Sequence, residues 1–268
     1  MGSWYRALVG IELRKIFAYR ANFWVEFFGT SLGHFGIAYF VWRAVYGGAG
    51  AETLGGYTFA SMLLYQLLVP IIGKATYSLD FSGIGDEVYT GALNRYLVYP
   101  VSFFSFRYVQ TMTSNLVLFV QLAIALLAFH HWIGFPPDFA LTPVRFAIFV
   151  AALACGISLA FLISWSVQLV AFWAESVWSL MVSYRLLVLF LGGAWIPLSL
   201  FPEGMANLLR WLPFRLLVSF PIEIFMGRLS PAEMRFGFAL ILGWMIVLSL
   251  IGRAVWRAGL KTYSGVGI

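Results

Sequence analysis

The chain alternates long apolar blocks with short polar gaps. Six blocks are mainly apolar: residues 22–46, 57–79, 104–129, 144–170, 177–198 and 236–251. A helix crosses the hydrocarbon core of a bilayer with about 20 mostly apolar residues. Runs such as 116–129 lack the apolar–polar alternation that strands of a membrane β-barrel require. The pattern therefore predicts an all-α integral membrane protein with six transmembrane helices.

Two further stretches are apolar but lack the pattern of a transmembrane helix. Residues 3–20 repeat apolar positions every three or four residues among basic ones, which predicts a helix lying on the membrane surface. Residues 200–227 are interrupted by prolines and charges and are still too apolar for a solvated loop. We expect this stretch to form short re-entrant helices, an outer hairpin at the membrane interface before the last span.

A polar interruption at residues 80–100 separates the second and third spans. We expect its interior, 85–96, to form one short amphipathic helix. Asp86 and Glu87 would stand at the positive N-terminus of this helix, and Arg95 near its C-terminal end. The segment must lie on one side of the membrane because both neighbouring blocks are apolar.

The distribution of basic residues predicts which side that is. An even number of spans places both termini on the same side, and that side holds nine Lys and Arg residues against six on the other. Segments facing the cytoplasm carry an excess of Lys and Arg. We therefore expect a multi-pass protein of the bacterial cytoplasmic (inner) membrane, with both termini and residues 80–100 in the cytoplasm.

Composition agrees with a membrane protein and excludes several other classes. Of 268 residues, 62% are hydrophobic and 10% are charged, whereas roughly a quarter are charged in soluble proteins. The net charge of +6 comes from residues spread singly over span ends, which argues against nucleic-acid binding. One cysteine, Cys155, permits no internal disulfide. The first 20 residues contain too many charges for a cleavable signal peptide.

Polar side chains inside the spans mark possible paths, because lipid offers them no partners. Gln110, Ser114 and Gln121 lie within about 40° of one another on an ideal helix. Ser164 and Gln168 form a shorter stripe on the fourth span. Two interpretations stay open for both stripes: a wall that faces a substrate, or ordinary hydrogen bonds between helices.

Two cations also fall inside spans. Arg185 needs a partner or water, because a cation costs at least ~2.5 kcal/mol at mid-bilayer. Glu26 and Glu175 are the candidate partners, and either a structural ion pair or a substrate contact fits. Lys74 is near the inner end of its span, from which its side chain can extend to the headgroups.

We find no sequence signal for catalysis or for a bound cofactor. The one Gly-Lys pair, Gly73-Lys74, is followed by Ala75 and has Leu68 where a phosphate-binding loop needs its first glycine. His130 and His131 are adjacent and would point apart on a helix, which argues against a metal site. We therefore expect no enzyme activity, and energy for any active process must come from a partner.

The order of these parts resembles the permease subunit of bacterial type-2 ATP-binding-cassette (ABC) transporters, in the branch with separate permease and ATPase chains. The resemblance covers essentially the whole length. The most specific residues are Gly-Gly-Ala-Trp-Ile-Pro-Leu-Ser-Leu-Phe-Pro at 192–202, Leu-Pro-Phe at 212–214, Pro221 and Gly227. The C-terminal Tyr-Ser-Gly-Val-Gly at 263–267 also resembles this branch.

That resemblance implies a dimer with an identical or related permease and two ATPases, which would bind the ATP and Mg. The helix within 80–100 would be the coupling helix that contacts an ATPase. The implied coupling residues are Asp86, Glu87, Tyr89, Asn94, Arg95, Glu12, Arg14, Lys15 and, as a second contact, Glu175. The outer hairpin would form a lid over the exit, with an outer gate at Pro197, Phe201, Pro202, Pro213 and Phe214.

The function that follows is export of a hydrophobic or amphipathic substrate, such as a lipid, a glycoconjugate or a drug-like molecule. A stand-alone secondary carrier or channel is the alternative, and it would place charged relays near the bilayer midplane. Arg185 is the one such residue that we identify from the sequence. A lipid-modifying enzyme would need a catalytic cluster at one interface, which the sequence does not show.

Overall fold

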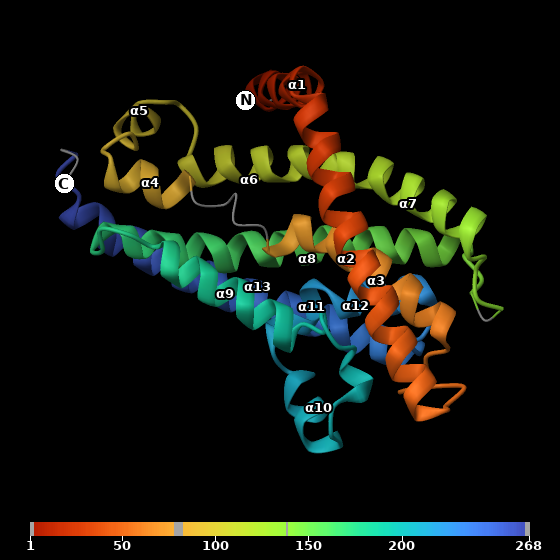
Figure 1. The fold of residues 1–268 in the computed structure, drawn as a ribbon. Helices are drawn as coiled ribbons and strands as arrows, with labels where there is room; N and C mark the ends of the chain where they lie inside the picture. Colours follow the sequence, from red (N-terminus) through yellow and green to blue (C-terminus); the bar gives the residue numbers. More distant parts are fainter. Residues whose placement is uncertain (1–2, 78–82, 138, 266–268) are drawn as a thin grey trace.

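The computed structural model describes residues 3–77, 83–137 and 139–265, and within these ranges the chain is all helical without a sheet (Figure 1). The helices are α1 (Ser3–Ala18), α2 (Arg20–Ala49), α3 (Phe59–Tyr77), α4 (Gly83–Tyr89), α5 (Asn94–Leu97), α6 (Phe103–Ser114), α7 (Leu118–Trp132), α8 (Pro143–Gln168), α9 (Trp178–Leu191), α10 (Glu203–Leu209), α11 (Pro213–Leu217), α12 (Ser219–Met226) and α13 (Pro231–Thr262). The described residues also form the 3-10 turns η2 (Asn115–Val117), η3 (Leu169–Phe172) and η4 (Leu198–Leu200).

Four helical segments among the described residues are long and apolar enough to cross a membrane. They are Phe59–Tyr77, Phe103–Trp132, Pro143–Phe172 and Pro231–Thr262. These segments coincide with the spans predicted at 57–79, 104–129, 144–170 and 236–251. The all-helical membrane class is thereby confirmed.

The other two predicted spans differ from this pattern. The α2 helix has 30 residues, about 45 Å at 1.5 Å per residue, and its interior contains Glu26, His34 and Arg43. The α9 helix has 14 residues and ends before Gly192, so one helix over 177–198 was a wrong prediction. Gly193 has φ +82, a left-handed conformation that breaks the helix. A total of six spans therefore stays a prediction.

The long helices begin at caps that the sequence encodes. Thr142 accepts a hydrogen bond from the backbone of Arg145, and Pro143 follows as the first helical residue of α8. Ser230 and Glu233 form a reciprocal capping box at the start of α13. Such residues satisfy backbone N–H groups that have no partner within the helix.

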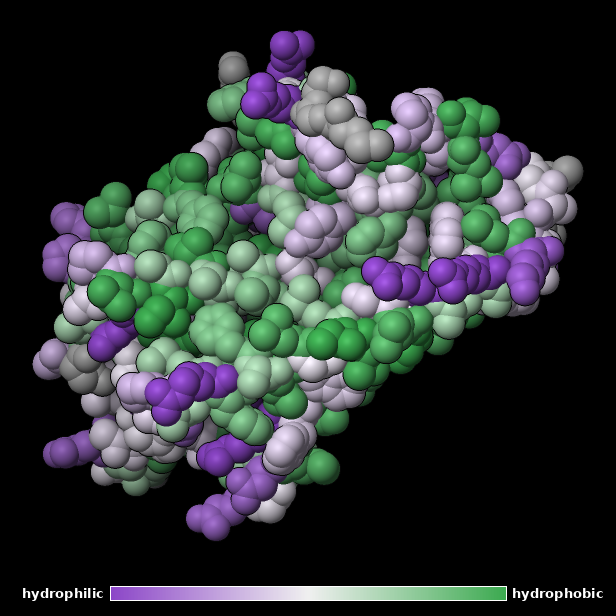
Figure 2. All heavy atoms as spheres, turned by 180° about the vertical axis from the view of Figure 1, so that it is seen from behind, coloured by the Kyte–Doolittle hydropathy of each residue, from purple (hydrophilic) through white to green (hydrophobic). Residues whose placement is uncertain are grey.

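The α3 helix is buried along nearly its whole length, and it packs against α2, α7 and α8. It continues through Pro70. In Figure 1, α6 and α7 follow one another end to end, α8 packs against α6 and α13, and α2 runs obliquely to them. Figure 2 shows hydrophobic residues across much of one face of the molecule, with hydrophilic residues gathered mainly toward its edges. A surface of this kind is expected where lipid is the solvent.

Glycines on α13 allow this helix to lie close to its neighbours. A Cβ added at Gly237 would overlap the ring of Phe220 in α12, and one added at Gly259 would overlap the ring of Phe172 in η3. In contrast, nothing lies within 4 Å of a Cβ added at Gly243. The close approach therefore depends on particular glycines of the helix.

Replacing Gly237 by Ala should lower the melting temperature of the purified protein in detergent. Phe220 is fully buried and cannot move aside, and overpacking of this kind costs about 1–3 kcal/mol. The matched control is Gly243→Ala on the same helix, which should leave the melting temperature unchanged or slightly higher. Equal melting temperatures for the two variants would contradict the packing of α13 on α12.

Candidate coupling site and membrane pocket

The polar segment after α3 forms two short helices, α4 and α5, and the prediction of one helix over 85–96 was wrong. Gly91 has φ +75 and ends the first helix, because this conformation cannot continue a right-handed helix. The backbone N–H of Leu93 then donates to the carbonyl of Glu87 at 2.8 Å, which folds α5 back onto α4. Residues 80–82 of the predicted segment lie outside the described ranges.

The carboxylate of Glu87 joins α4, α5 and α6. It accepts hydrogen bonds from Arg95 Nη2 at 3.0 Å and from Tyr96 Oη at 2.8 Å, and it also pairs with Arg107 of α6. The Glu87 side chain is buried, so its charge needs these donors. Burial raises the pKa of Tyr96, and the hydrogen bond to Glu87 raises it further. Tyr96 therefore stays protonated at neutral pH and donates.

A second set of hydrogen bonds holds α4 to the end of α8. The side-chain oxygen of Gln168, Oε1, accepts hydrogen bonds from the backbone N–H groups of Ile84 and Gly85, both at 3.2 Å. The Gln168 amide donates in turn to Ser164 Oγ at 2.7 Å, and both side chains are buried. The sequence left two interpretations open for Ser164 and Gln168, a wall that faces a substrate or hydrogen bonds between helices. In the structure, both side chains form hydrogen bonds within the protein.

The outward face of this unit is polar and aromatic. Asp86 and Arg95 are exposed, and Tyr89 is half-buried. The exposed Asn94 donates to the carbonyl of Gly265 at 2.7 Å, which brings the C-terminal segment to the same end of the molecule. In Figure 1, α4, α5 and the C-terminus lie at the left.

The turn between η3 and α9 lies beside α4, since a Cβ at Gly85 would contact Val177 and Ala171. Glu175, the predicted second contact, is exposed on this turn. Trp173 and Trp178 are exposed by 52% and 64% and flank it. We did not predict a role for these tryptophans from the sequence. An aromatic residue near the end of a span usually indicates an anchor at the membrane interface.

Of the three residues expected to assist coupling from the N-terminal helix, Glu12 attaches this helix to α6, whereas Lys15 pairs with Glu12 inside α1. Glu12 is buried and accepts a hydrogen bond from Gln110 of α6 at 2.8 Å, and Lys15 lies 4.0 Å from the same carboxylate. Arg14 is exposed. Glu12 therefore attaches α1 to α6 and faces away from the surface.

A polar pocket of about 460 Å³ lies between α2, α3, α7 and α9, within the apolar part of the molecule. On one side, Glu26 and Lys74 form an ion pair of 2.9 Å. On another, His34 and Gln66 are 3.1 Å apart, and Gln66 donates to the carbonyl of Trp195 at 3.2 Å. We missed His34 and Gln66 in the sequence, although a polar residue inside an apolar block is the signal that identifies them.

Arg185 lines this pocket from α9 and is exposed. Neither expected partner is confirmed, because Glu26 pairs with Lys74, and no carboxylate of the described ranges lies within 4 Å of Arg185. From the sequence, we expected the Lys74 side chain to extend to the lipid headgroups, but it pairs with Glu26 inside the protein. The amide nitrogen of Gln121 is buried beside the pocket without a hydrogen-bond acceptor among the described residues.

The predicted stripe on the third span is divided between two pockets, because Gln110 and Ser114 line a separate pocket of about 370 Å³ beside α1 and α6. Gln110 bonds to Glu12 and Arg107, and Ser114 donates to the carbonyl of Thr111 in its own helix. Only Gln121 lies at the polar pocket of α2, α3, α7 and α9. The 3-10 turn η2 interrupts the helix between Ser114 and Gln121, so ideal helical spacing does not hold across it.

The predicted outer-gate residues occupy different environments. Pro197 and Pro213 are buried, Phe201 and Phe214 are half-buried, and Pro202 is exposed at the start of α10. Near them, Arg215 and Glu223 form a largely buried ion pair of 2.9 Å between α11 and α12. Tyr65 donates to the carbonyl of Gly193 at 2.7 Å, which ties α3 to the turn after α9. Whether this region gates a path stays a prediction.

A family model described as ABC-2 family transporter protein matches residues 32–267. The chain belongs to this family. No curated protein sequence matches it significantly. The resemblance predicted from the sequence is confirmed, and it makes the chain an ABC transporter membrane protein. Membrane proteins of the ABC-2 family lack ATPase motifs and work with ATPase subunits.

No group of three His, Cys, Asp or Glu residues able to hold a metal comes together in the described ranges of this ABC-2 protein.

Replacing Glu87 by Ala should loosen the α4–α5 unit of the ABC-2 protein. The change leaves the Tyr96 hydroxyl without its acceptor and Arg107 without its carboxylate partner, at a cost of about 1–3 kcal/mol. Backbone amides of residues 83–97 should then exchange with deuterium roughly tenfold faster or more, because 1.4 kcal/mol corresponds to a factor of ten. Asp86→Asn, at the exposed neighbouring position, is the control and should keep wild-type protection. Unchanged exchange in Glu87→Ala would show that the network does not hold the unit together.

The polar pocket should contain water. In a Cys155→Ala background, which has no other cysteine, His34→Cys should react with a charged, membrane-impermeant thiol reagent in proteoliposomes. Ile37→Cys is the control: Ile37 is 70% exposed on the same helix, and lipid would cover it. Its reaction should be at least about tenfold slower, because a thiol in hydrocarbon does not ionise. Equal rates at the two positions would contradict a hydrated pocket.

Proposed function

We propose that this chain is the permease subunit of an ATP-driven exporter, with six spans and cytoplasmic termini. Two such permeases, identical or related, would assemble with two ATPases. The observation that carries the proposal is the attachment of the α4–α5 unit to two different span helices. Glu87 joins it to α6 through Arg107, and Gln168 joins it to α8.

The ATPase would contact the exposed face of this unit. Asp86 and Arg95 are the charged residues of that face, and Glu175 lies on the neighbouring turn with Trp173 and Trp178. A displacement of α4 would move the ends of α6 and α8 together, because hydrogen bonds and an ion pair join the three elements. Closure of the ATPase would thereby favour one of two arrangements of the spans, which is the thermodynamic requirement for driven transport.

The polar pocket between α2, α3, α7 and α9 is the transport-path candidate. It brings charged and amide groups into an otherwise apolar region, so it suits a substrate with both polar and apolar parts. Arg185 and Gln121 are the two predicted path residues that line it. The polar part of an amphipathic substrate would contact these groups in place of water. Its apolar part would contact apolar side chains.

One observation favours the alternative of a secondary carrier. Glu26, Lys74, His34 and Arg185 gather at the pocket, and titratable groups at membrane depth are typical of ion-coupled carriers. The family match weighs against it, because ABC-2 membrane proteins work with ATPases. Reconstitution of the purified chain alone separates the two functions, since a carrier moves substrate or protons without ATP.

Charge reversal at Asp86 should weaken the contact with the ATPase. We expect the wild-type chain, purified from native membranes in a mild detergent, to retain an ATP-binding-cassette subunit in equal stoichiometry. Asp86→Arg should reduce the retained ATPase at least about fivefold, because Asp86 is exposed and makes no internal ion pair among the described residues.

The control for this experiment is Glu203→Arg, an equal charge reversal at an exposed position of α10 in the predicted outer hairpin. It should keep the ATPase at the wild-type level. Loss of the ATPase in both variants would point to general destabilisation, and full retention in Asp86→Arg would place the contact elsewhere.

A further inference from the structure

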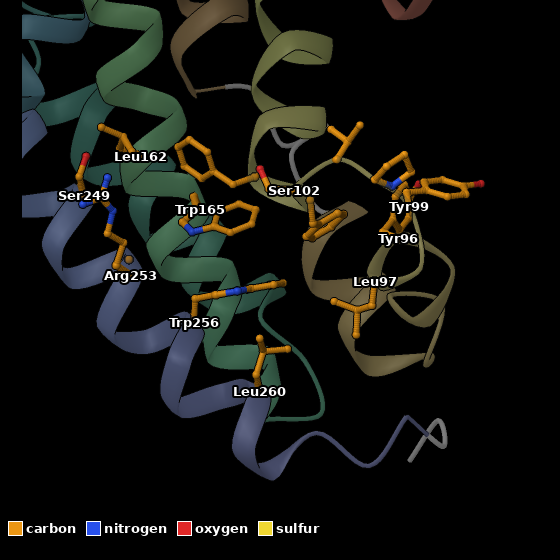
Figure 3. A pocket seen from close by; sticks show the side chains of 15 residues that line it. Tyr96, Leu97, Tyr99, Ser102, Leu162, Trp165, Ser249, Arg253, Trp256 and Leu260 are labelled. Atoms are coloured by element: carbon orange, nitrogen blue, oxygen red, sulfur yellow. The ribbon is translucent and has the colours of Figure 1, made fainter. Parts of the chain in front are cut away.

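A cavity of about 670 Å³ lies between the loop before α6 and the helices α8 and α13. It is distinct from the polar pocket described above and shares no residue with it. Figure 3 shows Tyr96 and Tyr99 on one side, Trp256 and Arg253 of α13 on the other, and Trp165 of α8 between them. The cavity is therefore at the same end of the molecule as α4 and α5.

Six of the fifteen residues that line the cavity are aromatic. The ring of Trp165 lies 5.5 Å from that of Trp256 and 5.2 Å from that of Phe104. At the rim, Leu97 and Tyr99 are exposed by 46% and 51%. An apolar chain fits such a wall, whereas a fully polar ligand would lose its hydration without compensation.

Arg253 supplies the one formal charge in the lining. Its side chain extends toward Ser249 on the same helix (Figure 3), and the Ser102 hydroxyl is also in the lining. No carboxylate of the described ranges lies within 4 Å of Arg253. The Ser102 hydroxyl already donates to Ser105 Oγ at 2.7 Å, which leaves Ser249 as the hydroxyl beside Arg253. A cation and a hydroxyl group beside apolar walls are complementary to an anion that carries an apolar chain.

The position of Arg253 along α13 matches the edge of a bilayer. Arg235 and Arg253 are 18 residues apart, or about 27 Å at 1.5 Å per residue, close to the roughly 30 Å of hydrocarbon. Exposed apolar side chains fill the interval: Leu242, Ile246, Val247, Leu250 and Ile251. This lipid-facing surface leads directly to Arg253, so a lipid can reach the cavity without leaving the bilayer.

We propose that the cavity binds an anionic phospholipid of the surrounding bilayer. Its phosphate would contact Arg253 and Ser249, and an acyl chain would lie along Trp165 and Phe104. Tyr96 belongs to the cavity wall and also donates to Glu87, so the bound lipid touches the network that holds α4 and α5. The proposal rests on the proposed function only in placing this end of the molecule in the cytoplasmic leaflet.

Native mass spectrometry of the full-length chain can measure this binding, with phosphatidylglycerol or phosphatidylcholine of identical acyl chains as probes. We expect the first phosphatidylglycerol to bind at least about fivefold more tightly than phosphatidylcholine. Arg253→Gln should reduce this preference to less than about twofold. Ser249→Trp, which fills the cavity, should weaken the binding of both lipids.

Arg257→Gln is the matched control, because Arg257 is an exposed cation one turn further along α13 and outside the cavity lining. It should keep the headgroup preference of the wild type. Equal affinity of the wild type for the two lipids would overturn the proposal, because the cavity would then select no headgroup charge. An equal loss in both arginine variants would overturn it in favour of a diffuse basic surface.

Adding the ATPase subunit should leave the bound phosphatidylglycerol in place. Displacement would assign the cavity to the protein interface and would also overturn the proposal. The lipid affinities are measured on the permease without its ATPase. A lack of headgroup preference would therefore not contradict the ATPase-retention experiment. Failure of ATPase retention likewise leaves the lipid measurement intact.

Discussion

Neither hydrocarbon nor a packed protein interior offers water as a hydrogen-bond partner, and this constraint governs the buried polar groups of the chain. A buried charge or amide must find its partner inside the protein or in a hydrated cavity. Glu87 has three donors, Gln168 bridges two backbone N–H groups and a serine, and Arg215 pairs with Glu223. Such partnerships connect helices that are distant in sequence. They therefore fix the tertiary structure more specifically than the many apolar contacts around them.

The same constraint explains how two short helices can act on a membrane domain. Helices of seven and four residues are too short to be stable alone. The α4–α5 unit acquires its rigidity from Glu87 and from the cap supplied by Gln168. Because those bonds reach α6 and α8, the unit is joined to these helices, and in the proposed function it would transmit a displacement to them. Breaking a buried charge partnership costs more than breaking an exposed one, which favours movement of the whole unit.

The two cavities of this ABC-2 protein differ in chemistry. The pocket between α2, α3, α7 and α9 gathers charged and amide groups, and the cavity beside α13 has aromatic walls and one arginine. Their separation is consistent with two roles, transport in the first and lipid binding in the second. Tyr96 links the second cavity to the α4–α5 unit, so the surrounding lipid and the ATPase would act on neighbouring groups.

The sequence by itself determined the class, the family and most helix positions. Apolar blocks of fixed length and encoded caps such as Ser230 and Pro231 are local properties, and local properties can be read along a chain. It also indicated that the segment after α3 is polar and carries Asp86 and Arg95. It did not reveal that Gly91 divides that segment into two helices, because a glycine is also compatible with a helix.

Only the tertiary structure decided which polar groups meet. Glu26 reaches Lys74 rather than Arg185, Gln110 faces Glu12, and Gln168 caps α4 from a different span. Each of these pairs is far apart in sequence, and each choice depends on helix rotation and crossing, which residue spacing does not specify. The physical reason is that a polar group in an apolar region needs some partner, while the packing of the helices selects which one it finds.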